Sequence, residues 1–314
     1  MSFIKGIISR IFSRDFYNRQ FKKIKSSFIR LDATPNPTLI MTLLVKNEED
    51  IIEENLIFHK AMGVDGFIVT DNNSTDNTVL ILKKYLDKGW IKEIIHETDD
   101  NYMQAAWVDK MILIAKNKYN VDWIINADAD EFWYCKSGNI KNEISRTKAN
   151  ILKCNMRCVL PEENKEFYKW VNTVKPIENP ELYKLSRFSI YNPQFPKVMH
   201  RTSYYQKIHV GNHFVDMKYI KEEKNQNILI YHYSIRDMMH FTNKVIIGGK
   251  SLEKNPNKAM GVHCRYWYEL YKQNKLTQEY NKIIGKHLFD LFKEIGTIQQ
   301  DTTIYNILSK LLQQ

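Results

Sequence analysis

The stretch that decides the fold runs from Val121 to Tyr134 and reads Val-Asp-Trp-Ile-Ile-Asn-Ala-Asp-Ala-Asp-Glu-Phe-Trp-Tyr. An apolar run ends in three carboxylates, those of Asp128, Asp130 and Glu131, and aromatic residues follow at once. Two such charges about 4 Å apart repel by roughly 4 kcal/mol at an effective dielectric of about 20. A divalent cation turns this repulsion into attraction, and oxygen ligands suit Mg²⁺ or Mn²⁺. The stretch therefore predicts a metal site at the end of a buried strand.

Strand and helix patterns alternate on the N-terminal side of this stretch. The apolar runs predict strands at residues 39–45, 66–70, 91–96 and 121–126, and the spacing between them predicts helices at 50–62, 74–87 and 104–119. Strands separated by helices of about ten to fifteen residues form a parallel, doubly wound sheet. Ligands bind beyond the carboxyl ends of such strands. Polar clusters follow three of the strands, at residues 46–49, 71–74 and 128–131.

The alternation weakens after about residue 150. Short β-like runs at 151–154, 188–191, 207–210 and 228–233 are joined by polar loops, and the chain from residue 237 onward is predicted to be mostly helical. The sequence thus predicts an α/β fold: a mostly parallel, doubly wound sheet flanked by helices, with an α+β second half and a helical C-terminus.

The first 30 residues form a distinct basic segment. Apolar residues such as Ile4, Ile8 and Ile11 recur at helical spacing, with Lys5 and Arg10 between them. Such a basic amphipathic helix, assigned to residues 1–33, either lies in a membrane interface or packs on its own domain. No run approaches the roughly 18 apolar residues that span a bilayer. We therefore expect a cytoplasmic protein, peripheral on the inner face of the cell membrane.

Charge and cysteine usage narrow the partners. Lys and Arg exceed Asp and Glu by 46 to 36, a net charge of +10, which favours anionic partners. No zinc-finger, RNA-recognition or helix-turn-helix signature is present, so we expect no nucleic acid. An anionic membrane surface or an anionic glycan fits better. The four cysteines match no paired C-x-x-C pattern and suit a reducing compartment.

The motifs together resemble a known family. A first strand ending in Asn47-Glu48, a second followed by Asp71-Asn72-Asn73-Ser74, and the later Asp128-Ala129-Asp130-Glu131-Phe132 resemble family 2 glycosyltransferases. The Asp-Ala-Asp-Glu-Phe form is similar to the bacterial branch placed in surface-polysaccharide and lipopolysaccharide synthesis. The resemblance covers about residues 38–250. It implies the GT-A fold, a nucleotide-sugar donor and a Mn²⁺ or Mg²⁺ cofactor.

The resemblance also implies roles for single residues. Asp71 matches the acid that contacts the nucleotide base or ribose, and Asp128 and Asp130 match the acids around the metal. Further donor-site candidates are Asn47, Glu48, Asn73 and Gln104, with Asp128 beside the diphosphate. For Asn47 and Glu48 a structural turn is an equal alternative. Ser74 and Asp76 are expected to cap the following helix, and Trp107 suits either the donor pocket or the core.

Histidines and basic residues are concentrated in the second half. His232-Tyr233 is followed by Arg236, Lys244 and Gly248, which resembles the second-half signature of the family. We predict that His232 completes the metal shell and that Arg236 and Lys244 stabilise the leaving group. A separate zinc site of His209, His213 and His232 is the alternative, but the sequence offers no evident fourth ligand.

The catalytic base is not decided by any local pattern. An inverting transfer, which the resemblance favours, needs a carboxylate that accepts the acceptor hydroxyl proton. Glu131 is the prediction here, and Glu162, Glu163 and Asp216 remain open.

These residues predict a metal-dependent enzyme that moves a sugar from a nucleotide-sugar to a surface glycan or lipid-linked precursor. Its expected parts are the N-terminal helix, a catalytic domain at 38–250 and a helical extension at 251–314. The catalytic domain divides into a nucleotide-sugar half, 38–135, and an acceptor half, 136–250. The alternative is a non-catalytic glycan-binding or membrane-associated scaffold. A sugar-nucleotide pyrophosphorylase is disfavoured, because residues 46–49 lack its glycine-rich loop.

Overall fold

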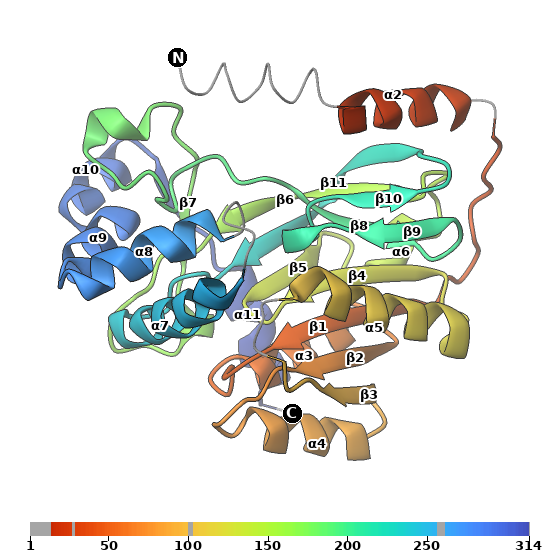
Figure 1. Ribbon diagram of the computed structural model, residues 1–314, viewed down its shortest axis with the longest axis horizontal. Helices are drawn as coiled ribbons and strands as arrows, with labels where there is room; N and C mark the ends of the chain where they lie inside the picture. The colour runs from red at the N-terminus through yellow and green to blue at the C-terminus, as the bar shows by residue number, and fades with distance from the viewer. Residues whose placement is uncertain (1–13, 27–28, 100–102, 256–260, 314) are drawn as a thin grey trace.

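The computed structural model describes residues 14–26, 29–99, 103–255 and 261–313, which place helices on both faces of one long sheet (Figure 1). Eight strands of the described chain form this sheet in the order β3-β2-β1-β4-β8-β6-β11-β5. They are β1 (Leu39–Val45), β2 (Gly66–Asp71), β3 (Ile91–His96), β4 (Trp123–Asp128), β5 (Glu131–Cys135), β6 (Ile151–Cys158), β8 (Lys197–Arg201) and β11 (Glu222–His232). The pairs from β3 to β4 and the pair β6–β11 are parallel, whereas β8 and β5 run antiparallel to their neighbours. The prediction of a mostly parallel sheet is confirmed.

Strand β1 shows why helices cover both faces. Leu39, Met41 and Leu43 point into one apolar core and Ile40 into a second, because side chains alternate along a strand. Helix α3 (Ile52–Ala61) packs in the first core, and α5 (Gln104–Tyr119) packs in the second. Helix α4 (Thr78–Asp87) flanks β3 at the sheet edge (Figure 1). This arrangement is doubly wound, and it leaves the carboxyl ends of β1, β2 and β4 at one edge.

The remaining elements surround this sheet. Two small antiparallel sheets pair β9 (Tyr205–Ile208) with β10 (Val215–Met217) and β7 (Asn172–Val174) with β12 (Ile298–Gln300). Short helices are α6 (Lys141–Ile144), η1 (Phe167–Lys169), η2 (Pro180–Tyr183), η3 (Val210–Asn212) and η4 (Lys286–Leu288). Helix α2 (Arg14–Ser26) lies over β9, β10 and β11, held by ion pairs of Arg19 and Lys23 with Glu222 (Figure 1).

The C-terminal part is helical, as expected. Its helices are α7 (Met238–Lys254), α8 (Val262–Lys272), α9 (Leu276–Ile284), α10 (Phe289–Glu294) and α11 (Thr303–Leu311). The first four surround a third apolar core that contains Phe241, Ile283 and Phe292. Helix α11 instead returns to the first half, where Ile304 and Leu308 join the core of Leu39. Among the described residues, no helix has the length and apolar character needed to cross a membrane.

The predicted strand at 188–191 is wrong. These residues form turns because serine side chains bind the local backbone: Ser186 Oγ accepts from Phe188 N at 3.0 Å and Ser189 Oγ from Tyr191 N at 3.3 Å. Such bonds compete with strand pairing. Strand β6 runs four residues further than predicted, to Cys158, and the helix expected from residue 74 begins at Thr78. Residues 1–13 of the predicted N-terminal helix lie outside the described residues.

Candidate active site at the carboxyl ends of the strands

The acidic turn carries the chain from the middle of the sheet to its edge. Strand β4 ends at Asp128 and β5 begins at Glu131, yet β4 pairs with β1 and β8 whereas β5 pairs with β11. In the antiparallel β5–β11 pair, Glu131 lies directly opposite His232. The Asp130 carbonyl accepts a hydrogen bond from Tyr233 N at 2.8 Å. The sheet register therefore brings together residues that are a hundred positions apart in the sequence.

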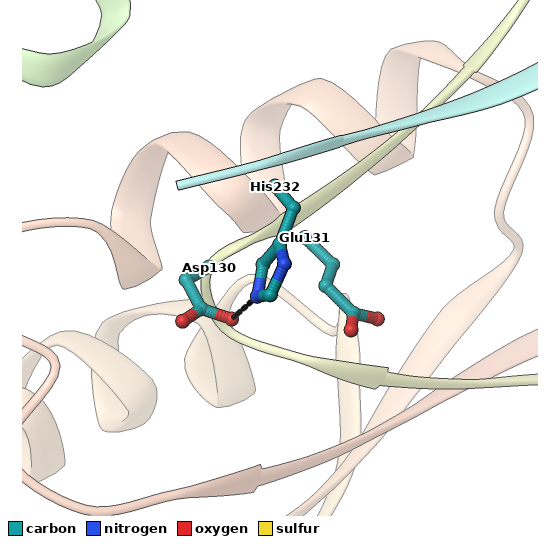
Figure 2. A group of neighbouring side chains, drawn as sticks. All are labelled: Asp130, Glu131 and His232. Atoms are coloured by element: carbon teal, nitrogen blue, oxygen red, sulfur yellow. Dashed lines mark ion pairs between the residues drawn. The ribbon is translucent and has the colours of Figure 1, made fainter. Parts of the chain in front are cut away.

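Asp130 is the centre of this site. One oxygen, Oδ1, lies 3.5 Å from His232 Nε2 (Figure 2). The other oxygen lies 3.3 Å from Lys244 Nζ. Burial alone would raise the pKa of Asp130, but Lys244, His232 and Arg236 hold it well below its usual value. Burial likewise opposes the charged form of His232, and the neighbouring Asp130 carboxylate nevertheless raises the pKa of His232 to about 10. Asp130 is thus an anion enclosed by cations.

Three side chains at this turn could hold a metal ion. Ligand atoms of Asp130, Glu131 and His232 lie within 4.8 Å of one another, and Figure 2 shows the imidazole between the two carboxylates. The Oδ1 atom of Asp130 is buried and has no hydrogen-bond partner within the described chain. Two carboxylates and an imidazole are a donor set that Mn²⁺ accepts. Asp128, also predicted as a metal ligand, lies outside this group of three.

A buried lysine that we did not anticipate occupies the other side of the turn. Lys197 on β8 is 4% exposed, and its Nζ lies 2.9 Å from Asp128 Oδ2 and 2.6 Å from Glu131 Oε1. Burial alone would lower the pKa of Lys197, but these two carboxylates raise it above its ordinary value. Burial raises the pKa of Glu131 to about 7, although Lys197 acts in the opposite direction. The Glu131 side chain is fully buried.

Arg236 connects helix α7 to the end of β1. Its guanidinium donates to Glu48 Oε2 at 2.5 Å and to Asp50 Oδ1 at 2.7 Å, and it also contacts His240. Burial raises the pKa of Glu48 to about 7, although Arg236 lowers it. Arg236 is 4% exposed. The two basic residues predicted from the second half therefore have different partners: Lys244 contacts the acidic turn, and Arg236 contacts the loop after β1.

Asn55 and His59 of helix α3 form hydrogen bonds to the backbone of the acidic turn and of β5, and neither residue was predicted from the sequence. Asn55 donates to the carbonyls of Ala129 and Glu131, at 2.8 and 3.1 Å. His59 Nε2 accepts from Trp133 N at 3.0 Å. Burial lowers the pKa of His59 to about 3, so the ring is neutral. The available signal was an Asn and a His four residues apart on the buried face of a helix.

The predicted donor-site residues lie at the ends of β1 and β2. Asp71 is 3% exposed, and its Oδ2 lies 3.7 Å from His96 Nδ1. Asn47 Oδ1 accepts from Thr75 N at 2.7 Å, and Asn73 donates to Thr98 O at 3.1 Å. Gln104 begins α5 and is half-buried. Asp71, Asn47 and Asn73 thus lie at the carboxyl-end edge of the sheet. Gln104 follows residues 100–102 in the sequence, which are outside the described chain.

The side chains of Ser74 and Asp76 connect the loop before helix α4 to the loop after β1. Ser74 Oγ accepts from Asn47 N at 2.9 Å, and Asp76 Oδ2 accepts from Glu49 N at 3.2 Å. The N-cap of α4 is Asn77, whose side chain makes no capping hydrogen bond. The expected cap by Ser74 is therefore wrong, because its hydroxyl binds the loop after β1, whereas Asp76 Oδ1 accepts from Thr78 N, the first residue of α4, at 2.9 Å. Trp107 is buried, at 8% exposure.

The other second-half candidates are occupied elsewhere. His209 Nε2 lies 3.0 Å from Asp216 Oδ2, and His213 Nδ1 lies 3.2 Å from Pro196 O. Within the described residues neither histidine shares a metal-ligand group with His232, so the alternative zinc site is not formed. Glu162 Oε1 accepts from Val171 N at 2.7 Å. Glu163 pairs with Lys286 at 3.1 Å on the surface.

The sheet and the acidic turn beyond its strands define a glycosyltransferase of the GT-A type. The family follows from the sequence: the model of glycosyl transferase family 2 matches residues 43–211, more than half of the chain, and the chain belongs to this family. It is therefore a glycosyltransferase. A search of the curated proteins finds no match.

Several solved structures are similar at low identity. Residues 1–349 of Staphylococcus aureus TarS are 13% identical, with 81% of this chain and 74% of that chain covered and a TM-score of 0.40. Glucosyl-3-phosphoglycerate synthase from Mycobacterium tuberculosis, solved with Mn²⁺ and uridine diphosphate, is 15% identical, with 71% and 82% covered and a TM-score of 0.36. The mannosyltransferase PcManGT from Pyrobaculum calidifontis, solved with GDP-Man and Mn²⁺, is 18% identical, with 43% and 41% covered and a TM-score of 0.33. The chain thus spans less than half the length of that mannosyltransferase.

Proposed function

We propose that this glycosyltransferase moves a sugar from a nucleotide-sugar donor to a surface glycan or lipid-linked precursor, with inversion, and that it requires Mn²⁺ or Mg²⁺. The observation that carries the proposal is the group of Asp130, Glu131 and His232, whose ligand atoms lie within 4.8 Å beyond the carboxyl end of β4. Ligands of doubly wound sheets bind at that edge. The polysaccharide branch of the family rests on the Asp-Ala-Asp-Glu-Phe motif.

Asp130 and His232 are the proposed metal ligands, with Asp128 completing the predicted set. The buried Oδ1 atom of Asp130 supports this assignment: it lies 3.5 Å from His232 Nε2 but accepts no hydrogen bond within the described chain, and a cation would satisfy it. When bound, the ion supplies positive charge to the diphosphate that leaves with the nucleoside. Lys197 already neutralises Asp128 and Glu131, so we place Asp130 first among the ligands.

Lys244 and Arg236 have different proposed roles. The Lys244 side chain is 46% exposed beside Asp130, and we propose that it binds the leaving diphosphate. Arg236 is buried and holds Glu48 and Asp50, so it positions the loop beside the donor. Glu131 stays a prediction as the base. Its pKa of about 7 suits proton transfer, but its buried carboxylate would have to become accessible to the acceptor hydroxyl.

The donor is proposed to bind along the ends of β1 and β2. Asp71 would contact the base or ribose, and Asn47, Glu48, Asn73 and Gln104 would surround the nucleotide. Support for this donor site comes from the loops after β1 and β2, which hydrogen bonds of the Ser74 and Asp76 side chains hold together.

We also propose that the chain divides into an N-terminal helix at 1–33, a catalytic domain at 38–250 and a helical extension at 251–314. The nucleotide-sugar half of the catalytic domain ends at residue 135.

The decisive experiment replaces Asp130. Purified protein is incubated with Mn²⁺ and a panel of UDP-, GDP- and CMP-sugars, and released nucleotide is measured. We expect release from at least one donor, and a loss of about 100-fold or more in Asp130→Asn because charge stabilisation at the leaving group is removed. Asp87→Asn, at an exposed position of α4, is the matched control. Nucleotide release that is equal in Asp130→Asn and the wild type would refute the proposal.

We further propose peripheral contact with the anionic inner face of the cell membrane. Phe21 and Ile24 of α2 are 63% and 64% exposed, and the chain carries a net charge of +10. Removing residues 1–30 should reduce sedimentation with phosphatidylserine vesicles, and Phe21→Ser should reduce it without a deletion. Equal sedimentation of all three proteins would exclude this helix as the contact.

A further inference from the structure

A cavity of about 730 Å³ lies beside the active site and is not used by the mechanism above. It opens between helix α3, the loop at 161–170, the start of α7 and helix α9. Arg236 lines it, whereas Asp130, Lys244 and His232 do not. The cavity is therefore separate from the metal cluster and shares one buried wall with it. Its volume is within the range of small-molecule sites, about 300 to 1,000 Å³.

Aromatic side chains form much of the cavity wall. Phe167 and Trp170 are buried, at 7% and 6% exposure, and belong to the core of the first sheet face. Tyr168 and Tyr280 are partly exposed, and Tyr280 packs against the third core. The cavity thus lies where two separately packed cores meet. Sugar rings present C–H groups that pack on such aromatic faces, while their hydroxyls need polar partners nearby.

The polar lining is acidic in a basic protein. Six acidic residues, Asp50, Glu54, Glu162, Glu163, Glu166 and Asp237, face three basic ones, Lys165, Arg236 and Lys286. The formal charge of the lining is therefore 3 − 6 = −3, against +10 for the whole chain. A nucleoside diphosphate, a phosphate or a uronic acid would be repelled there. The lining excludes the donor and favours a neutral or positively charged ligand.

Some of these acidic side chains already accept hydrogen bonds from the protein, whereas Glu54 has capacity to bind a ligand. Glu162 accepts from the Val171 and Asn172 amides, and Asp237 caps helix α7 by accepting from His240 N. The half-buried Glu54 carboxylate bonds its own backbone amide and makes no hydrogen bond to another side chain within the described part of the chain, so it has capacity to accept from a ligand. Glu54 is therefore positioned to accept a hydrogen bond from a ligand hydroxyl or amine.

We infer that this cavity is a subsite for the acceptor glycan and takes a neutral or amino sugar unit. The inference rests on the proposed transfer to a glycan, and it specifies the acceptor. Arg236 joins the two sites, because its guanidinium bonds Glu48 at the donor edge and Asp50 at the cavity. An acceptor held here would be oriented by a sugar next to the one that reacts.

Binding is tested with three trisaccharides on the full-length protein: neutral chitotriose, its de-N-acetylated amine form, and trigalacturonic acid. Saturation-transfer NMR and titration should show binding of the neutral or the amine trisaccharide, and no binding of the acid. Tyr168→Ala should weaken binding about tenfold through loss of the aromatic face, and Glu54→Gln should weaken the amine form more than the neutral one. Leu113→Ala, on the exposed face of α5, is the control.

Each result decides the inference. Binding of none of the three, equal binding of the acid, or unchanged binding in folded Tyr168→Ala and Glu54→Gln would overturn it. The bound trisaccharide should accelerate nucleotide release from the donor in the wild type and in Leu113→Ala, and this acceleration should disappear in Tyr168→Ala. The proposed function is tested separately, by comparing nucleotide release in Asp130→Asn and in the wild type. If the trisaccharides bind but the protein turns over no donor, the acceptor role of the cavity is overturned.

Discussion

Asn55 shows at the scale of one residue how the acidic turn is kept in place. Its amide spans the carbonyls of Ala129 and Glu131, and its Oδ1 lies 2.9 Å from His59 Nδ1. Within the turn between β4 and β5, the Asp130 carbonyl accepts from Tyr233 N, and the Asn55 side chain supplies the donors for the carbonyls on either side of it. The carboxylate of Asp130 is then presented from a fixed backbone.

Asn55→Ala should loosen the turn without changing the fold. Two buried carbonyls lose their donor, which should lower the free energy of unfolding by about 2 to 3 kcal/mol. Loss of this support behind the proposed metal ligand Asp130 should weaken Mn²⁺ binding about 10- to 100-fold. Urea unfolding and Mn²⁺ titration check both values, with Asn117→Ala on the exposed face of α5 as the control. Unchanged Mn²⁺ affinity in a destabilised variant would contradict the link.

The sequence located the acids better than their partners. Asp130 could be predicted because three carboxylates close in sequence need a counter-charge, and His232 because the family signature includes it. Lys197 could not be predicted, since one lysine in a short strand carries no local signal. Only the antiparallel pairing of β8 with β4 brings it to Asp128.

At the scale of elements, Glu222 joins helix α2 to the sheet. Its carboxylate lies 2.8 Å from Arg19 Nη2, 3.3 Å from Lys23 Nζ and 2.6 Å from Lys153 Nζ. Burial alone would raise the pKa of Glu222, but Lys153 and Arg19 lower it to about 2 from an ordinary value of 4.5. The attachment of α2 therefore depends on this carboxylate being ionised.

Glu222→Gln should destabilise the protein by about 1 to 2 kcal/mol at pH 7, because its partners are partly screened by solvent. A lowered carboxyl pKa stabilises the fold fully above pH 4.5 and loses this effect as the pH falls toward 2. The difference between the variant and the wild type should therefore shrink at pH 3. Urea unfolding at both pH values measures it, with the exposed Glu178→Gln as the control. A difference independent of pH would argue against the ion pairs.

Elements of the first half were predictable because each helix and strand has one strong pattern. The four predicted strands at 39–96 and 121–126 are present with small shifts at their ends. Strand β5 was not predicted, because its residues 132–135 are apolar or aromatic without alternation and the strand follows β4 after a two-residue turn. The three-residue strands β7, β10 and β12 are too short to show any period.

At the scale of the whole molecule, the chain end closes the first core. Ile304 and Leu308 of α11 are 1% and 0% exposed and pack in the same cluster as Leu39, Trp123 and Phe132. The C-terminal helices therefore contribute to the core of the first half of the chain as well as to their own helical core. We expect the protein to unfold as one cooperative unit.

Ile304→Ala should lower the midpoint of the whole unfolding transition. Removing a buried aliphatic side chain costs about 2 to 4 kcal/mol. The urea midpoints measured by Trp fluorescence and by circular dichroism should shift together, because the space left by the substitution lies in the shared core. Leu312→Ala, at a position that is 38% exposed, should have little effect. A variant in which only part of the signal shifts would show that the C-terminal helices unfold separately.

Lys197 has one further consequence. Its ammonium group is part of the chain, so Asp128 and Glu131 acquire a counter-ion as soon as β8 pairs with β4. Folding of the acidic turn then does not have to wait for a cation from solution, unlike small domains that fold only around zinc. We expect the fold to survive dialysis against a chelator, and the proposed metal-dependent turnover to return on addition of Mn²⁺, Mg²⁺ or Co²⁺, so that different ions can be compared in one protein preparation.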